Sequence, residues 1–296
     1  MPKDIQNSLL YGKLVLVAIF FGSTFIAGKI LAQYVPPFTA SFLRFFIAAS
    51  FLMIYISLVY PKRPHLNNRV KFLILTLALT GIVGYNFFFF SGLKRIDASR
   101  ASMIVALNPA SIMLFSCIFY QEKLNLRKIS GIILSFSGAL IVITHGHPQS
   151  LFQGSIGLGE LYILGCVICW TSFTLISKLV IKSMPALITI ALACGTGALI
   201  LFFPAWQEGF IQHFQDFNLT IWLSAFALGL LGTVIAYLWY YQGIKKIGPS
   251  RTGIFINFVP VSATAMAILF LDEKLSTSFV MGAILVIMGV CLMNKK

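Results

Sequence analysis

Ten apolar stretches of about 20 residues dominate the sequence, and that length is what an α-helix needs to span a bilayer. They lie near residues 14–35, 38–60, 72–93, 100–120, 128–145, 157–177, 186–206, 220–243, 250–271 and 276–293. Charged residues make up 10% of the chain, against roughly a quarter in soluble domains. We therefore expect an all-α, polytopic membrane protein with ten transmembrane helices, not a compact soluble enzyme or a secreted disulfide scaffold.

The positive charge of the chain is distributed unevenly between the two sides of the expected membrane. Sorted by alternate loops, sixteen Lys and Arg residues fall on the side of the termini and five on the opposite side. Cytoplasmic loops carry the Lys and Arg excess, so both termini are expected in the cytoplasm of a cell with a bacterial-type inner (plasma) membrane. The net charge of +14 then reflects topology and contact with the lipid bilayer, and we expect no nucleic acid as a partner.

The two halves of the chain repeat each other. Residues 92–142 match residues 243–293 at a constant offset of 151, without gaps. Each half holds five expected helices, and an odd number means that the second copy enters the membrane from the opposite face. We expect two inverted five-helix repeats, residues 1–150 and 151–296, an architecture typical of transporters.

Several short motifs mark the chain, and most of them recur in the two halves. They are Phe20-Phe21-Gly22-Ser23-Thr24-Phe25 with Cys169-Trp170-Thr171-Ser172-Phe173, Arg44-Phe45, Asn108-Pro109 followed by Glu122-Lys123-Leu124, and Pro260 followed by Glu273-Lys274-Leu275. With these motifs the chain resembles, over nearly its whole length, the EamA-type carriers of the drug/metabolite transporter superfamily. The resemblance implies a carrier, and it favours export of small metabolites such as amino acids. Uptake of a metabolite or nucleotide-like solute is the alternative, because family members carry very different solutes.

Two prolines lie near the middle of their expected spans. Pro109 and Pro260 should break a helix there, since proline lacks the backbone donor and displaces a carbonyl. Asn108 and Asn257 then lie beside freed backbone acceptors. Broken helices at matching positions of two inverted halves predict a solute-binding site, whereas a simple packing kink is the alternative.

Aromatic and amide side chains on the third, sixth and eighth spans are further candidates for binding a solute. A buried Tyr or Trp needs a partner for its polar atom. We therefore select the polar members of these runs, which are Tyr85, Asn86, Trp170, Tyr237 and Tyr240. Anchoring at the membrane interface is the usual alternative for such residues.

Arg44 is the cation that lies deepest within an expected span. It falls about seven residues, or about 10 Å, inside the end of the second helix, where ionised residues are costly and usually functional. Arg44 either recognises an anionic group on the solute or holds the hairpin of the first two helices. Lys29 lies at a similar depth, so the two cations could form one electropositive patch, unless Lys29 extends to the headgroups.

Several features are absent from the expected spans. None of the acidic residues lies deep in a span, which favours zwitterionic or carboxylate solutes over organic cations. Glu122 and Glu273 lie at helix ends, where they are expected to cap a helix or to pair with the adjacent lysines. The histidines lie in loops or at helix ends, so we expect no catalytic residues, metal or cofactor. An intramembrane enzyme and a channel rank below the carrier, and the chain could act as a monomer or a homodimer.

Overall fold

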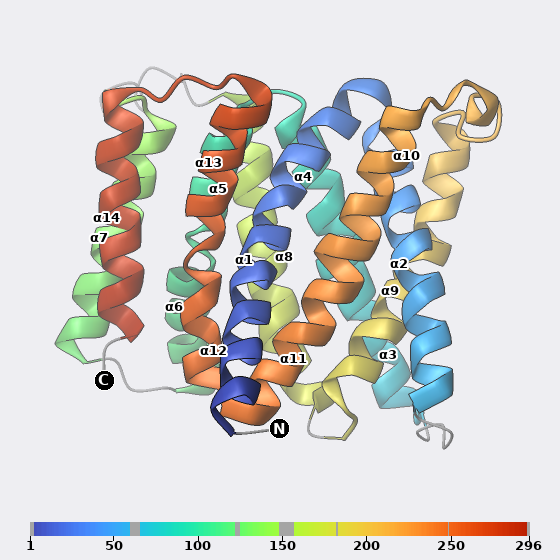
Figure 1. The fold of residues 1–296 in the computed structure, drawn as a ribbon, viewed down its shortest axis with the longest axis horizontal. Coiled ribbons are helices and arrows are strands. Elements are labelled where there is room, and N and C mark those ends of the chain that lie inside the picture. Colours follow the sequence, from blue (N-terminus) through green and yellow to red (C-terminus); the bar gives the residue numbers. More distant parts are fainter. Residues whose placement is uncertain are drawn as a thin grey trace.

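The computed structural model describes residues 3–59, 66–121, 125–147, 157–181, 183–247 and 249–294, which form helices joined by short connections (Figure 1). In chain order the helices are α1 (Lys3–Tyr34), α2 (Pro37–Val59), α3 (Asn68–Leu77), η1 (Ala78–Gly84), α4 (Tyr85–Leu93), α5 (Ala98–Val105), α6 (Asn108–Tyr120), α7 (Leu126–Ile143), α8 (Leu158–Ile181), α9 (Ala186–Gln207), η3 (Phe214–Asp216), α10 (Leu219–Phe226), η4 (Ala227–Ile235), α11 (Ala236–Ile247), α12 (Pro249–Ile256), α13 (Val259–Leu271) and α14 (Thr277–Asn294).

The predicted fold class is confirmed for the residues described above. Nine helical segments are long and apolar enough to cross a membrane, and α14 supplies a shorter tenth with the apolar stretch Thr277–Met293. α1, α2, α7, α8, α9 and α14 are each one continuous helix. The other four segments are composite, because the helix changes its winding or breaks within the span.

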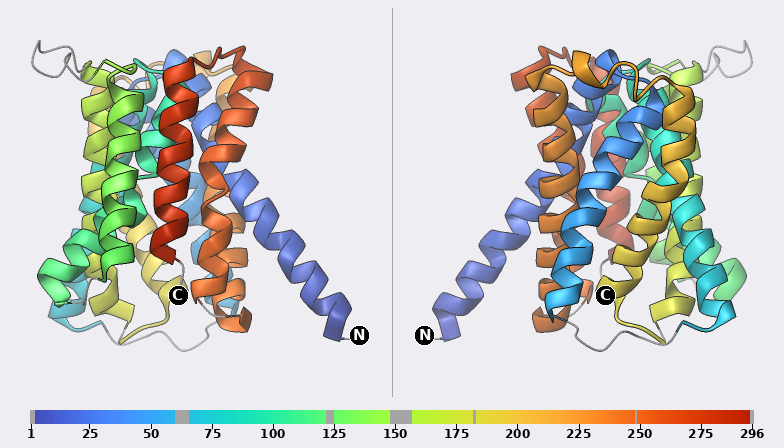
Figure 2. Two further views of the ribbon diagram at one scale, coloured as in Figure 1. Left: turned by 90° about the vertical axis from the view of Figure 1, so that its left-hand side faces the viewer. Right: turned by 90° about the vertical axis from the view of Figure 1, so that its right-hand side faces the viewer.

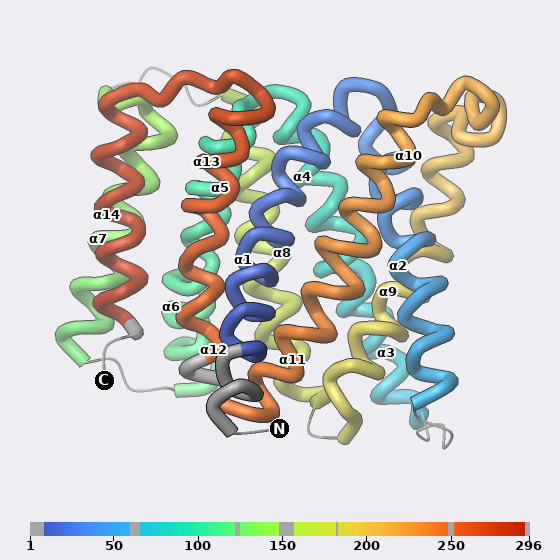
Figure 3. Tube along the Cα trace, in the orientation of Figure 1, coloured from blue at the N-terminus to red at the C-terminus, as the bar shows by residue number. Residues whose placement is uncertain are grey.

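The composite segments occupy matching places in the two halves of the chain (Figure 3). η1 lies between α3 and α4, and η4 between α10 and α11; both are π-helical. The breaks between α5 and α6 and between α12 and α13 each place a proline, Pro109 or Pro260, in the first turn of the second piece. Proline suits that position because its missing N–H would have had no helical partner there.

α7 and α14 are the last helices of the two halves. They pack closely against each other along most of their length, at one side of the bundle (Figure 1). Glycine makes this approach possible. A Cβ atom on Gly138 would lie 2.6 Å from the carbonyl oxygen of Gly282, and one on Gly289 would lie 2.4 Å from Oγ of Ser135. Gly131, Ser135 and Ala139, spaced four residues apart on α7, therefore face α14 within the same chain.

Helices of the first half pack mainly on helices of the second half. α2 lies along α9, α4 along α8, and α1 against α13 and η4. The first helix begins and the last one ends at the same end of the bundle, which we call the terminal end (Figure 1). The opposite end, where α2, α5, α10 and α14 begin, is called the distal end. Near the terminal end α1 leans away from the other helices (Figure 2).

Candidate functional site

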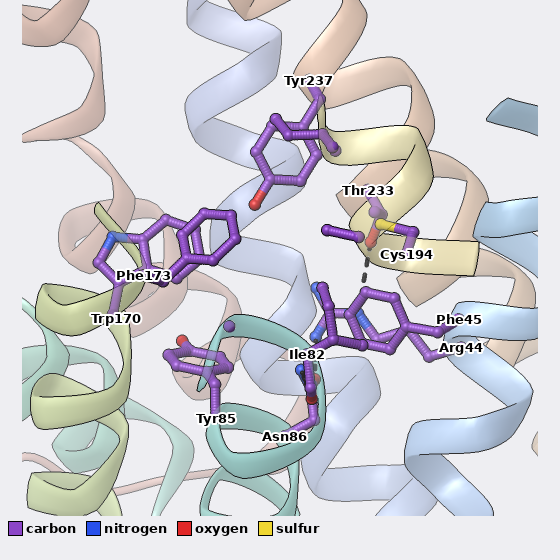
Figure 4. A pocket seen from close by; sticks show the side chains of 13 residues that line it. Arg44, Phe45, Ile82, Tyr85, Asn86, Trp170, Phe173, Cys194, Thr233 and Tyr237 are labelled. Atoms are coloured by element: carbon purple, nitrogen blue, oxygen red, sulfur yellow. Dashed lines mark hydrogen bonds between the residues drawn. The ribbon is translucent and has the colours of Figure 1, made fainter. Parts of the chain in front are cut away.

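Arg44 lies inside the protein on α2, with 8% of its surface exposed. Its Nε donates a hydrogen bond to Oγ1 of Thr233 on η4 (3.3 Å), and Nη1 donates to Oδ1 of Asn86 on α4 (3.1 Å; Figure 4). The guanidinium group therefore joins three helices that are far apart in the sequence, one of them in the second half.

The two acceptors of Arg44 are themselves held by backbone carbonyls of the π-helical segments. Nδ2 of Asn86 donates to the carbonyl of Ile82 (2.8 Å), and Oγ1 of Thr233 donates to the carbonyl of Leu228 (2.9 Å). Each bond leaves a side-chain oxygen lone pair directed at Arg44. π-Helical turns occur frequently at functional sites, and here they fix the position of the guanidinium group.

The charge of Arg44 has no counter-ion among the residues that the structure describes. No carboxylate there lies within 4.0 Å of the guanidinium group, and the ion pairs present involve other residues. A guanidinium group has five N–H donors. Two of them reach Thr233 and Asn86, so three, including both on Nη2, have no protein acceptor within the described chain. Burying a charge in this way is costly unless a ligand or water completes its bonds.

Aromatic side chains form the wall opposite Arg44. The ring of Tyr85 lies 5.4 Å from that of Trp170, which stacks on Phe173 at 5.3 Å. Tyr237 packs edge-on against Phe21 with ring centroids 5.7 Å apart, and its hydroxyl points into the space between these groups (Figure 4). Such rings can contact an apolar body or a cationic group of a solute.

These side chains enclose a small pocket between the two halves of the chain. α2, η1 and α4 of the first half line it together with α8, α9, η4 and α11 of the second half. Its free volume is about 20 Å³, which is room for roughly one water molecule. Ala193, which stands 149 residues after Arg44, also lines the pocket. The pocket would have to widen before it could hold a metabolite.

Five of the residues selected from the sequence meet in this pocket: Arg44, Tyr85, Asn86, Trp170 and Tyr237. The sequence interpretation missed other lining residues, among them Thr233, Cys194 and Phe173. A threonine or a cysteine in an apolar span gives little signal, because it can bond to a carbonyl of its own helix, as Thr233 does.

Three other candidates do not line this pocket. Asn108 begins α6, where its Oδ1 is buried without a hydrogen-bond partner in the described chain. Asn257 lies in the turn between α12 and α13, and Tyr240 is on α11, one turn beyond Tyr237. A solute role for these residues stays a prediction. Pro109 and Pro260 lie at the helix breaks described above.

Lys29 does not join Arg44 in an electropositive patch. Its Nζ donates to the carbonyl of Ile96 (2.9 Å), at the distal connection between α4 and α5. The lysine stem thus carries the ammonium group toward the end of the bundle, and Lys29 is absent from the described lining of the pocket.

Comparison with known proteins identifies the family. The model of the EamA-like transporter family matches the chain twice, over residues 9–144 and 157–295. The uncharacterized transporter YyaM of Bacillus subtilis is 29% identical over 283 residues, which cover 95% of this chain and 92% of YyaM. An uncharacterized transporter of Archaeoglobus fulgidus is 28% identical, covering 98% of this chain and 99% of its own.

A protein of known crystal structure has the same fold. It superimposes with a TM-score of 0.61 at 20% sequence identity, and the match covers 94% of each chain. The family model and the two relatives match nearly the whole length of the chain, and both relatives are named as transporters. The chain belongs to the EamA-like transporter family.

Proposed function

We propose that the protein is a carrier, working as an exporter, that moves small metabolites such as amino acids across the inner membrane. It does so by alternating access between two inverted five-helix repeats, residues 1–150 and 151–296. The two matches of the family model support the repeat, as do the helix breaks and π-helical segments at equivalent places in the two halves. The excess of Lys and Arg on the side of the termini supports a cytoplasmic position for both ends.

The observation that carries the proposal is the buried Arg44 without a counter-ion in a pocket formed by both halves. A carboxylate on the solute would supply the missing negative charge, and a planar guanidinium group binds a carboxylate through two parallel hydrogen bonds. Because the described pocket has no carboxylate of its own, an amine on the solute would be met by the rings of Trp170 and the tyrosines.

The small volume of the pocket fits alternating access. A site of about 20 Å³ is closed around little more than a water molecule, so solute binding requires the helices of the two halves to separate on one side. We assign Arg44, Tyr85, Asn86, Trp170 and Tyr237 to this site. Asn108 and Asn257 would contact solute only in a conformation with a larger cavity, to which the breaks at Pro109 and Pro260 would contribute.

The first experiment is a thermal-shift screen of the purified protein against amino acids, organic acids and nucleosides. A solute that binds only the folded form at about 100 times its Kd stabilises it by about 2.7 kcal/mol. Hits should contain a carboxylate or a similar anionic group. A set of hits made up only of cations or uncharged nucleosides would contradict the assignment of Arg44.

The second experiment is counterflow in proteoliposomes with a labelled hit. A carrier accumulates label transiently against its gradient, and the initial rate saturates with solute concentration. Flux that is linear in concentration together with ionic conductance would indicate a channel, and chemical conversion of the solute would indicate an enzyme. Transport driven only inward in cells would replace export by uptake.

A further inference from the structure

Two glutamates of the second half bind helix N-termini of the first half at the distal end. Glu273 accepts hydrogen bonds from the backbone N–H groups of Ala98 (2.7 Å) and Ser99 (3.0 Å) and from the Ser99 hydroxyl, at the start of α5. The unpaired N–H groups and the positive end of the helix dipole attract a carboxylate there. The capping role expected for Glu273 is thus present, and the helix capped is α5; Glu122 lies outside the described residues.

Glu208 makes the same set of bonds at the start of α2. Its carboxylate accepts from the backbone N–H groups of Phe38 (3.1 Å) and Thr39 (2.6 Å) and from the Thr39 hydroxyl (2.9 Å). Both glutamates are half-buried and follow the C-terminal ends of their helices, α9 and α13. The two contacts are therefore matched in chemistry, although they join different helix pairs.

The helix pairs differ in how far they pack. α2 and α9 share a buried apolar cluster that runs from Phe42 to Leu52 on α2 and from Ile190 to Ala205 on α9. α13 instead contributes the small buried residues Ala263 and Ala267 to the cluster it shares with α5, and its larger residues Val259, Met266 and Leu271 pack against that cluster while still partly exposed. Toward the terminal end α6 and α12 make no comparable contact in the described residues, and they lie on opposite sides of the bundle (Figure 2).

A further polar contact fixes α5 to α8. Nη1 of Arg100, one residue after Ser99, bonds to Oε1 of Glu160 at 3.0 Å. α5 and α8 are thereby joined as neighbours, and Glu273 is the charged group that ties α13 to them. Separation of α13 from α5 would break this tie and less packing than separation of α2 from α9, which would expose the apolar cluster between those two helices.

We propose that Glu273, Ala98 and Ser99 form a distal gate. The Glu273 carboxylate holds the start of α5 against the end of α13 while the distal side of the carrier is closed, and it releases α5 when that side opens. Water can solvate the carboxylate and the N–H groups after release, because the contact lies at the end of the bundle. Such bonds suit a reversible contact, since the net free energy of a hydrogen bond exchanged with water is small.

This inference rests on the proposed carrier function. Its test measures the opening of the distal end directly and therefore needs no solute. Ser102, buried on α5 one turn below the gate, is replaced by Cys as a reporter after the native cysteines are replaced by Ala. Purified protein in nanodiscs is reacted with a water-soluble thiol reagent. Glu273→Gln removes the charge of the gate, and Glu208→Gln is the matched control.

We expect the reporter to react about tenfold faster in Glu273→Gln. The charged carboxylate makes its hydrogen bonds to α5 only in the closed state, so its loss destabilises that state and raises the population of the open one. In Glu208→Gln the reaction rate should stay within about twofold of that of the parent protein. The melting temperatures of Glu208→Gln and Glu273→Gln should nevertheless fall by similar amounts, because the two glutamates make equivalent hydrogen bonds. Equal rates in both variants, or an unchanged rate in Glu273→Gln, would overturn the gate.

A second pair of variants decides the matter if Glu273→Gln does not fold. Ser99→Ala and Thr39→Ala each remove one hydroxyl donor from the equivalent contacts. Ser99→Ala should raise the reporter rate by about two- to threefold, and Thr39→Ala should leave it unchanged. The opposite ranking would refute the gate. Counterflow is measured separately, so a failed gate and a failed carrier function give different results.

Discussion

At the scale of single residues, the chemistry of the site depends on one charge that the protein leaves incompletely paired. Arg44 bonds to the neutral side chains of Asn86 and Thr233, and these are fixed by helix carbonyls. A neutral setting keeps the guanidinium group in place without cancelling its charge. This arrangement suits the reversible binding of an anion, because a fixed carboxylate partner would compete with the solute.

Arg44→Lys tests this role of the guanidinium group. Lysine keeps the charge but cannot bond to Thr233, Asn86 and a carboxylate with one planar group, so the Kd for an anionic solute should rise about tenfold or more. The measurement is the concentration dependence of the thermal shift. Lys29→Gln is the control, because it removes a cation that bonds to Ile96 outside the pocket. An equal loss of affinity in both variants would argue against a specific role of Arg44.

His145 gives the folded protein a pH dependence of its own. Burial and the nearby charge of Arg100 lower the pKa of this histidine, which lies just outside the membrane-spanning part of α7. The unfolded chain therefore binds a proton more readily than the folded protein, and stability falls as the pH drops below about 6.5. In His145→Gln the melting temperature should fall less between pH 7.5 and 5. Parallel curves for the two proteins would refute this contribution.

At the scale of elements, the distinctive contact is the close crossing of α7 and α14. Gly138 meets Gly282 backbone to backbone, and a methyl group there has no free space. Gly195 on α9 is also helical, but a Cβ atom on it would have no neighbour within 4 Å. Replacing each of these two glycines by alanine therefore separates the effect of close packing on stability from the effect of helix propensity.

Gly138→Ala should therefore lower stability by about 1 to 3 kcal/mol, as overpacking does. Gly195→Ala should raise stability by up to about 1 kcal/mol, because alanine has the higher helix propensity. Both values can be compared through the melting temperature of the purified protein. If Gly138→Ala were as stable as Gly195→Ala, the close approach of α7 and α14 would be wrong.

The composite helices show which element features the sequence could predict. Pro109 and Pro260 marked the breaks because proline cannot continue the hydrogen-bond pattern of a helix. The π-helical segments η1 and η4 gave no such signal, since their residues suit an ordinary α-helix equally well. The effect of η1 and η4 on the site comes from their backbone carbonyls, which accept hydrogen bonds from the side chains of Asn86 and Thr233. The sequence carries no sign of these bonds.

At the scale of the whole molecule, length and hydrophobicity predicted the spans because each must cross the same apolar layer. The pocket was predicted in part. Arg44, Tyr85 and Tyr237 stand out in an apolar span because their polar atoms are costly there. For Lys29 the sequence left two alternatives open, and the structure shows the side chain extended toward the end of the bundle; depth along a helix does not determine the direction in which a long side chain extends.

The proposed inverted repeat makes a prediction about the two faces of the membrane. Lys94 and Lys245 occupy equivalent places in the two halves, 151 residues apart, and both are exposed. Lys94 follows α4 at the distal end, whereas Lys245 lies in the last turn of α11 at the terminal end (Figure 1). In a protein without native cysteines, Lys94→Cys should react with an impermeant thiol reagent applied to intact cells.

Lys245→Cys should react with the same reagent only after the membrane is made permeable, because the excess of Lys and Arg predicts that the terminal end faces the cytoplasm. Reaction of both positions on the same side would contradict the inverted repeat, and with it a solute pocket shared by two oppositely oriented halves. Reaction on opposite sides in the reverse sense would keep the repeat and overturn only the orientation. The two positions therefore test the architecture and the direction of insertion separately.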